Sequence, residues 1–421
     1  MNPLRQTLIG LAILILGGPF SHLAAQVQRW PMKEWPVARP SEVGVDAGPL
    51  DALEAKIRAG KHGYVDSMTV IRCGRLVYDK SYKHDYDKIY GEQARTPGPL
   101  NHDPKGPYNY FNPDWHPFYQ RGELHSMQSI TKTVTSIVIG VAIARGDFPP
   151  VTTPMMKFLD EAKVRNVDAQ KRRITIEHLL TMTAGMEWNE NLPYNDPKNS
   201  ADVMEASRDW VQYAVDQPMA QEPGALFNYS SGSSQILSHI FKKATGRDIS
   251  DYAAEHVFRP MGITHYWKRT PTGLSDTEGG LYLRAHDLAK FGLLFLKGGK
   301  WEGNQLLRAD WVAESVAPHT TVDQGPVKYG YKWWLPPYGP DNALAWAGSG
   351  FGGQRLIVLP KEEMIVVATG WTTLVPSIGM RAVLGSASAA ATKFSCAAVR
   401  RCSAVAQWVL SGAGGQNRRR P

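Results

Sequence analysis

Apolar residues follow two different spacings along the chain, and the change of spacing separates strand-like ends from a helical middle. Residues 68–73 and 75–80 are rich in β-branched and apolar side chains on either side of Gly74, a pattern typical of a β-hairpin. Three further runs of this kind lie near the other end of the chain, at residues 343–347, 354–359 and 364–369.

Between these ends the apolar residues recur at helical spacing. Starting at Ile130 they appear at i, i+4, i+7 and i+11, which predicts an amphipathic helix that opens at Ser129 and stops at Gly146. Helical patterns also mark residues 50–57, 176–180, 201–215, 233–244, 250–257 and 285–296.

This arrangement predicts an α/β (α+β) fold. We expect an antiparallel sheet built from both chain ends and flanked by helices, with an inserted, mostly helical domain. Residues 85–123 are polar, aromatic and Pro-rich without clean periodicity, and we expect them to form a long ordered loop around a site.

Residues 1–25 have the features of a signal peptide. Arg5 precedes the apolar run 8–16, and small residues at 24–25 offer a cleavage site. The run is well short of the ~20 residues that a membrane span needs. We therefore expect a periplasmic or secreted protein with no stable membrane span after cleavage; an uncleaved anchor is the alternative.

Composition narrows the function classes. Of 421 residues, 43% are hydrophobic and 20% are charged, as in an ordinary globular enzyme. The net charge of +8 includes the final Arg418–Arg420 run. Because no basic stretch is interleaved with aromatic residues, we expect no nucleic-acid partner.

Cysteine content and the end of the chain raise two further points. Cys73, Cys396 and Cys402 are too few for a disulfide scaffold; Cys396 and Cys402 are a possible pair, and Cys73 is expected to be a buried thiol. After Trp371 the chain becomes rich in Ala, Ser and Arg. We therefore separate a domain at residues 35–371 from an atypical C-terminal tail at 372–421, in which a helix over 389–410 is possible and an altered reading frame is one hypothesis.

The tetrapeptide Ser129-Ile130-Thr131-Lys132 opens the central predicted helix. A serine hydroxyl attacks a carbonyl when a nearby base takes its proton, and a lysine can serve if burial and neighbouring charge lower its pKa. The helix N-terminus adds free N–H groups where an oxyanion would develop. Taken alone, the tetrapeptide fits a helix cap followed by a surface lysine at least as well.

Two later segments change this balance. Residues 223–232 form a turn-rich loop that contains Tyr229, and residues 346–354 place small residues between two strand-like runs. In this order the three segments resemble the three boxes of the serine β-lactamase and penicillin-binding protein superfamily. The resemblance covers roughly residues 35–371 and is closest to the class C β-lactamase-related branch, which contains serine esterases, D-stereospecific peptidases and 6-aminohexanoate-dimer hydrolases.

The resemblance implies roles for the matching residues. Ser129 would be the nucleophile, Lys132 its base partner, and Tyr229 the group that passes protons to the leaving group. The backbone N–H groups of Ser129 and Phe351 would form the oxyanion hole. The residues that would contact substrate are Ser231, Gly348, Ser349 and Gly350.

The chain departs from the β-lactamase pattern at two positions. Ser231 stands where the Tyr-x-Asn loop has Asn, and Gly348 stands where the Lys-Thr-Gly box has Lys. That lysine supplies a positive charge facing the carboxylate of β-lactams, so its absence removes an ionic handle. A neutral ester or amide substrate is therefore favoured over a lactam.

Competing chemistries are weaker. Residues 348–353 match G-x-G-x-x-G, but a strand-like run follows where a dinucleotide site needs a helix. The sequence has no G-x-S-x-G, H-E-x-x-H or P-loop and no Cys/His cluster at metal spacing, so no metal or cofactor is called for.

The expected function is that of an exported serine hydrolase, which cleaves a small-molecule ester or amide through an acyl-enzyme on Ser129. The alternatives are β-lactamase or D-amino-acid peptidase activity, or a non-catalytic binding or sensor protein on the same fold.

Overall fold

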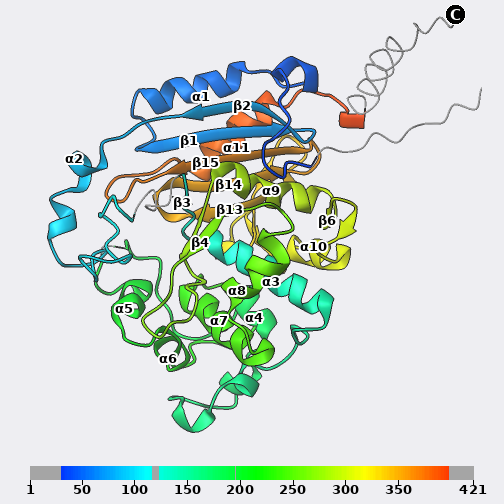
Figure 1. The fold of residues 1–421 in the computed structure, drawn as a ribbon. Helices are drawn as coiled ribbons and strands as arrows, with labels where there is room; N and C mark the ends of the chain where they lie inside the picture. The colour runs from blue at the N-terminus through cyan, green and yellow to red at the C-terminus, as the bar shows by residue number, and fades with distance from the viewer. Residues whose placement is uncertain (1–29, 116–122, 195, 398–421) are drawn as a thin grey trace, which may run out of the picture. The chain divides into compact units, whose positions relative to one another are not determined.

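The computed structural model describes residues 30–115, 123–194 and 196–397, and an eight-stranded antiparallel sheet runs through this part of the chain (Figure 1). Its order is β2-β1-β15-β14-β13-β10-β9-β8, so the N-terminal hairpin pairs with the last strand. This confirms the sheet built from both chain ends. Its strands are β1 (Val65–Arg72), β2 (Arg75–Ser81), β8 (Thr320–Thr321), β9 (Lys328–Tyr329), β10 (Trp334–Leu335), β13 (Trp346–Gly350), β14 (Gln354–Leu359) and β15 (Met364–Gly370).

Helices occupy the middle of the chain, as predicted, and several of them form the helical region drawn in green in Figure 1. The α-helices are α1 (Gly48–Arg58), α2 (Tyr86–Tyr90), α3 (Ile130–Arg145), α4 (Ile176–Leu180), α5 (Ser200–Ala206), α6 (Trp210–Val215), α7 (Ser231–Thr245), α8 (Ile249–Ala253), α9 (Ala285–Leu296), α10 (Ala309–Ser315) and α11 (Met380–Ala390). Shorter strands complete the fold: β3 (His125–Ser126), β4 (His265–Trp267), β5 (Leu281–Leu283), β6 (Lys300–Trp301), β7 (Asn304–Gln305), β11 (Pro337–Tyr338) and β12 (Ala343–Leu344).

Both faces of the large sheet are covered by helices. Helices α1 and α11 pack against each other over one face, in a core cluster that includes Val70 and Val366. Helices α3 and α9 cover the other face, in a cluster that includes Ile71 and Ile365. Neighbouring strand residues thus enter different cores, because side chains alternate across a strand. The central strands are apolar for this reason.

Two helix predictions need correction. The pattern over 201–215 is two helices, because Asp209 accepts hydrogen bonds from the N–H groups of Val211 and Gln212 and starts α6 anew. Helix α3 has no exposed polar face: every residue from 130 to 142 is buried, since the helix packs on the sheet on one side and on α8 on the other. No helix among the described residues is both long enough and apolar enough to cross a bilayer.

The loop predicted over 85–123 is ordered in its described part. Lys268 is fully buried beside Asp276 (3.6 Å), and its Nζ lies 4.5 Å from the ring centroid of Tyr108 and 5.1 Å from that of Tyr110. A cation against two aromatic faces holds the loop on the core. The loop therefore has a fixed position next to β4.

The C-terminal segment packs with the domain up to the end of the described residues. Helix α11 buries Val383, Leu384, Ala387 and Ala390, and Arg72 on β1 donates to the carbonyl of Thr392 (2.9 Å) beyond it. The possible helix over 389–410 is interrupted in its described part: α11 ends at Ala390, Ala391 bridges Val45, and residues 396–397 are helical again. The rest of that stretch and the predicted signal peptide lie outside the described residues.

A disulfide joins Cys73 to Cys396, with the two Cα atoms 5.3 Å apart. The suggested pairing of Cys396 with Cys402 is therefore wrong, and Cys73 is not a free thiol. Sequence spacing favoured the near pair, but the fold brings residues 323 positions apart into bonding distance because α11 returns the chain to the β1–β2 turn.

We expect purified protein to titrate one thiol per chain under denaturing, non-reducing conditions, because the Cys73–Cys396 disulfide uses two of the three cysteines of the sequence. Cys396→Ser should lower the free energy of unfolding by about 2–5 kcal/mol, the usual contribution of a native disulfide. Thiol counting and thermal unfolding measure the two effects, with Cys402→Ser as the matched control. Three free thiols, or equal destabilisation by both variants, would contradict the pairing.

Candidate active site

Ser129 lies at a sharp turn between β3 and α3. Gln128, just before it, has φ +48°, a left-handed conformation that non-glycine residues rarely adopt. The N–H of Met127 donates to the carbonyl of Leu281 on β5 (2.8 Å), which fixes the turn. The Ser129 hydroxyl does not cap the helix, so it is available for other contacts.

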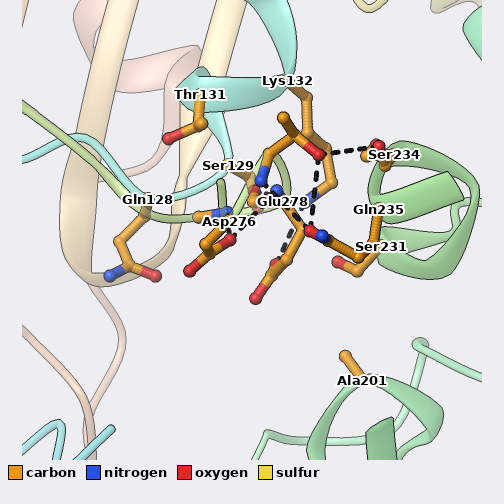
Figure 2. Close-up of polar contacts among 12 residues, drawn as sticks. Gln128, Ser129, Thr131, Lys132, Ala201, Ser231, Ser234, Gln235, Asp276 and Glu278 are labelled. Atoms are coloured by element: carbon orange, nitrogen blue, oxygen red, sulfur yellow. Dashed lines mark hydrogen bonds and ion pairs between the residues drawn. The ribbon is translucent and has the colours of Figure 1, made fainter. Parts of the chain in front are cut away.

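Lys132 contacts Ser129 directly. Its Nζ donates to Ser129 Oγ (2.8 Å) and to the carbonyl oxygen of Glu278 (2.8 Å), and it lies 3.5 Å from Glu278 Oε2 (Figure 2). The Lys132 side chain is 1% exposed. The reading of Ser129 and Lys132 as a helix cap and a surface lysine is thereby excluded.

Tyr229 completes this group. It precedes α7, and its ring stacks on Trp334 with centroids 5.5 Å apart. Lys132 Nζ lies 5.2 Å from the Tyr229 ring centroid, and both Ser129 and Lys132 are close enough to the Tyr229 hydroxyl to act on its pKa. The structure thus brings together the three residues predicted to be catalytic.

The electrostatics differ from the expected lowering of the lysine pKa. Burial alone would lower the pKa of Lys132, but the Tyr229 oxygen, Glu278 and Glu190 outweigh burial and raise it. Burial also raises the pKa of Tyr229, against the lowering effect of Lys132. At neutral pH the resting site therefore holds an ammonium group and a neutral phenol.

Glu190 anchors the loop that carries Tyr229. This buried carboxylate accepts hydrogen bonds from the N–H and Oγ of Ser231 (2.7 Å each), from Trp188 Nε1 (2.8 Å) and from the Tyr194 hydroxyl (2.8 Å). Ser231, predicted to contact substrate, is itself fully buried. Its position fixes the start of α7 and hence Tyr229.

The third box, residues 346–354, begins on β13. The C-terminal end of this strand lies against the turn at Ser129. A Cβ at Gly350 would come within 2.5 Å of the Met127 carbonyl oxygen, so only glycine allows this approach. Neither the Phe351 N–H nor the Ser129 N–H donates a hydrogen bond to another described residue. Two free amides near one serine are what an oxyanion hole requires. Ser349 is partly exposed on β13 beside them.

Packing against α3 disfavours a larger residue at Gly348, the position where the Lys-Thr-Gly box has lysine. A Cβ at Gly348 would lie 3.3 Å from Ile130 and 3.4 Å from Thr133, so a side chain at this position would start in tight contact with α3. Lys332 does not replace that charge: it is buried, its Nζ is 3.2 Å from Met182 Sδ, and burial followed by the charge of Lys132 holds its pKa well below the usual value.

A pocket in front of Ser129 is rich in carboxyl groups, which sequence reasoning missed. Glu205 and Asp202 on α5 and Glu278 before β5 line it, together with Leu100, Tyr110, Gln128, Ser129, Tyr194, Ala201 and Phe351. These carboxyl groups have no periodic or motif signal, because they come from separate segments. No three His, Cys, Asp or Glu side chains among the described residues are arranged to hold a metal ion.

The fold and the site's geometry agree with the comparisons to known proteins. The chain is 22% identical over 275 residues to a 6-aminohexanoate-dimer hydrolase of Paenarthrobacter ureafaciens (59% of this chain, 68% of the relative). It is 24% identical over 150 residues to esterase EstB of Burkholderia gladioli (33% and 37%). A D-stereospecific amidohydrolase from Streptomyces sp. superposes with a TM-score of 0.57 at 17% identity, over 81% of this chain and 98% of that one.

These similarities place the chain among the serine hydrolases of the β-lactamase and transpeptidase superfamily. Because the Beta-lactamase family profile matches residues 50–371, the chain belongs to that family. The resemblance inferred from the three boxes is confirmed.

Gly350→Ala should lower kcat for a nitrophenyl ester by about 10- to 100-fold, because the new methyl group pushes the Phe351 N–H away from Ser129. Gly385→Ala is the matched control, since its Cβ meets no atom within 4 Å and it lies on exposed helix. Steady-state kinetics with a thermal-unfolding check measure the effect. Equal kcat for wild type and Gly350→Ala would show that this close approach does not matter.

Ester hydrolysis should still be rising from about pH 7 to about pH 9, because one proton must leave the Lys132–Tyr229 pair before Ser129 attacks and both pKa values are raised. The profile of kcat/KM against pH, corrected for spontaneous hydrolysis, measures this. A plateau reached below about pH 6 would contradict the charged resting state.

Proposed function

We propose that the protein hydrolyses a carboxylic ester or amide through an acyl-enzyme on Ser129. The observation that carries this proposal is the 2.8 Å hydrogen bond from Lys132 Nζ to Ser129 Oγ inside the protein. Burying a lysine costs folding free energy, so a purely structural role does not explain it. A lysine that is hydrogen-bonded to a serine, beside two free backbone amides, suits acyl transfer.

The hydrogen bonds suggest the path of the proton. Lys132 donates to Ser129 Oγ, so the hydroxyl proton of Ser129 is free to point to the Tyr229 oxygen. Once the pair has lost one proton, Tyr229 accepts the proton of Ser129 as Oγ attacks the carbonyl carbon. Tyr229 then returns a proton to the leaving alcohol or amine, and water cleaves the acyl-enzyme by the same steps.

Charge favours neutral or cationic substrates. Three carboxyl residues line the pocket, and no lysine or arginine is among the residues that line it. A carboxylate on the substrate would therefore find no cation among the residues that line the pocket, where β-lactams need attraction. The relatives named as an esterase, a 6-aminohexanoate-dimer hydrolase and an amidohydrolase support this substrate class.

We also propose that the protein acts outside the cytoplasm. The apolar N-terminal run and the Cys73–Cys396 disulfide both support export, because disulfides persist in oxidising compartments.

The test compares wild type with Ser129→Ala and Lys132→Ala on a short-chain nitrophenyl ester, a nitroanilide and a chromogenic cephalosporin, with intact mass recorded. We expect an acyl adduct on wild type and none on Ser129→Ala. Lys132→Ala should lose at least about 10³-fold in kcat/KM. Ser136→Ala, a buried serine on the same helix, should keep wild-type activity.

Cephalosporin turnover equal to ester turnover would overturn the substrate class and leave the acyl-enzyme standing. Absence of any adduct with a fluorophosphonate probe would favour the binding-protein alternative.

A further inference from the structure

A chain of ionisable side chains connects Lys132 to the pocket in front of Ser129. Glu278 Oε2 is 3.5 Å from Lys132 Nζ, and the Glu278 side chain is hydrogen-bonded to that of Glu205. The hydroxyl of Tyr110 donates to Glu205 Oε1 (2.6 Å). Lys132 is thus linked through two carboxyl groups to the loop around the site.

Two carboxyl groups in a hydrogen bond must share a proton, since two carboxylates repel each other. Glu278 faces the ammonium of Lys132: burial raises its pKa, but Lys132 and Glu205 outweigh burial and lower it. Burial and the charge of Glu278 hold the pKa of Glu205 well above its usual value. The proton therefore resides on Glu205.

We propose that Glu205 is a positioning residue of this site: as a carboxylic acid it donates a hydrogen bond to Glu278 and holds Glu278 against Lys132. Glu205 does not touch the reacting atoms. It acts through Glu278, whose carbonyl and carboxylate orient the ammonium toward Ser129. The expected kinetic effect rests on the proposed acyl-enzyme function. The proton shared between Glu205 and Glu278 does not depend on that function.

The groups that face the pair set its response to pH. The cations that face Glu205 and Glu278 are Lys132 on α3 and Lys268, which directly follows β4. Asp276 also faces them, and its pKa is raised to about 6 by burial and by the charge of Glu278. Further titratable neighbours are Tyr108, Tyr110 and Tyr194, and also Asp202, whose Oδ1 lies 2.6 Å from His102 Nε2.

The sign of the effect follows from these charges. As pH rises, Glu205 ionises and adds a second negative charge beside Lys132, which makes Lys132 and Tyr229 hold their proton more tightly. Glu205→Gln keeps a hydrogen-bond donor but cannot ionise. Its rising limb of kcat/KM should therefore lie about half a pH unit or more below that of wild type.

The first measurement does not depend on turnover. The infrared difference spectrum of wild type minus Glu205→Gln at neutral pH should contain the C=O band of a protonated carboxylic acid, and that band should disappear at alkaline pH. Glu54→Gln is the matched control, because Glu54 also accepts from a tyrosine (Tyr78, 2.6 Å) but lies on α1, on the other face of the sheet. Its difference spectrum should lack this band: burial raises the pKa of Glu54, but Tyr78 and Arg58 lower it on balance.

The second measurement is kinetic, on an uncharged nitrophenyl ester. Glu205→Gln should stay within about 3-fold of wild-type kcat at neutral pH, whereas Glu205→Ala should lose about 10-fold or more in kcat with KM unchanged, because it leaves Glu278 without its donor. Glu54→Gln should match wild type in both kcat and pH profile.

Absence of the protonated band would overturn the proposal even if the enzyme is active, and so would equal loss of kcat in Glu205→Gln and Glu205→Ala. The band without ester turnover in wild type would leave the shared proton standing, remove its role in positioning a catalytic lysine, and reject the acyl-enzyme proposal instead.

Discussion

The ammonium group of Lys132 must be kept inside the protein next to Ser129, and the rest of the site depends on this. A buried charge is costly unless every donor finds a partner. Ser129 Oγ and the Glu278 carbonyl each lie 2.8 Å from Nζ, and the Tyr229 oxygen and the Glu278 carboxylate complete the set. The residues that satisfy the charge are also those that would guide the proton of Ser129, so stability and reactivity share the same contacts.

The large sheet supplies the rigidity that this arrangement needs. Helix α3 begins in the first third of the chain, while β13 comes from its last quarter, yet α3 packs on the strand that carries Gly350. Because β13 is hydrogen-bonded to β14, and β14 to β15, the Phe351 amide cannot move independently of the core. The close approach of β13 to the Ser129 turn requires glycine at position 350, and it also requires the strand order that holds β13 in the sheet.

Several carboxyl groups lie around Ser129 and its neighbours, and they come from three segments of the chain. Glu190 holds the Tyr229 loop through Ser231, Glu278 holds Lys132, and Glu205 reaches Glu278 from α5. The pocket therefore differs in charge from one built for an anionic β-lactam, although the fold is that of the Beta-lactamase family. Family membership fixes the architecture, and under the proposed function these side chains would set the preference for substrate charge.

The amino-acid sequence by itself determined the sheet from both chain ends and the helix that opens at Ser129, because strand and helix spacing are local features. That Ser129, Lys132 and Tyr229 meet was expected from the resemblance of the three boxes to a known family. Only the tertiary structure decided the rest. The raised pKa of Lys132 depends on Glu278 and Glu190, which are distant in sequence and follow no pattern. The Cys73–Cys396 pair overrode the nearer Cys396–Cys402 spacing, since α11 returns the chain to β1. Contacts between segments far apart in sequence leave no periodic trace, so spacing alone could not have revealed them.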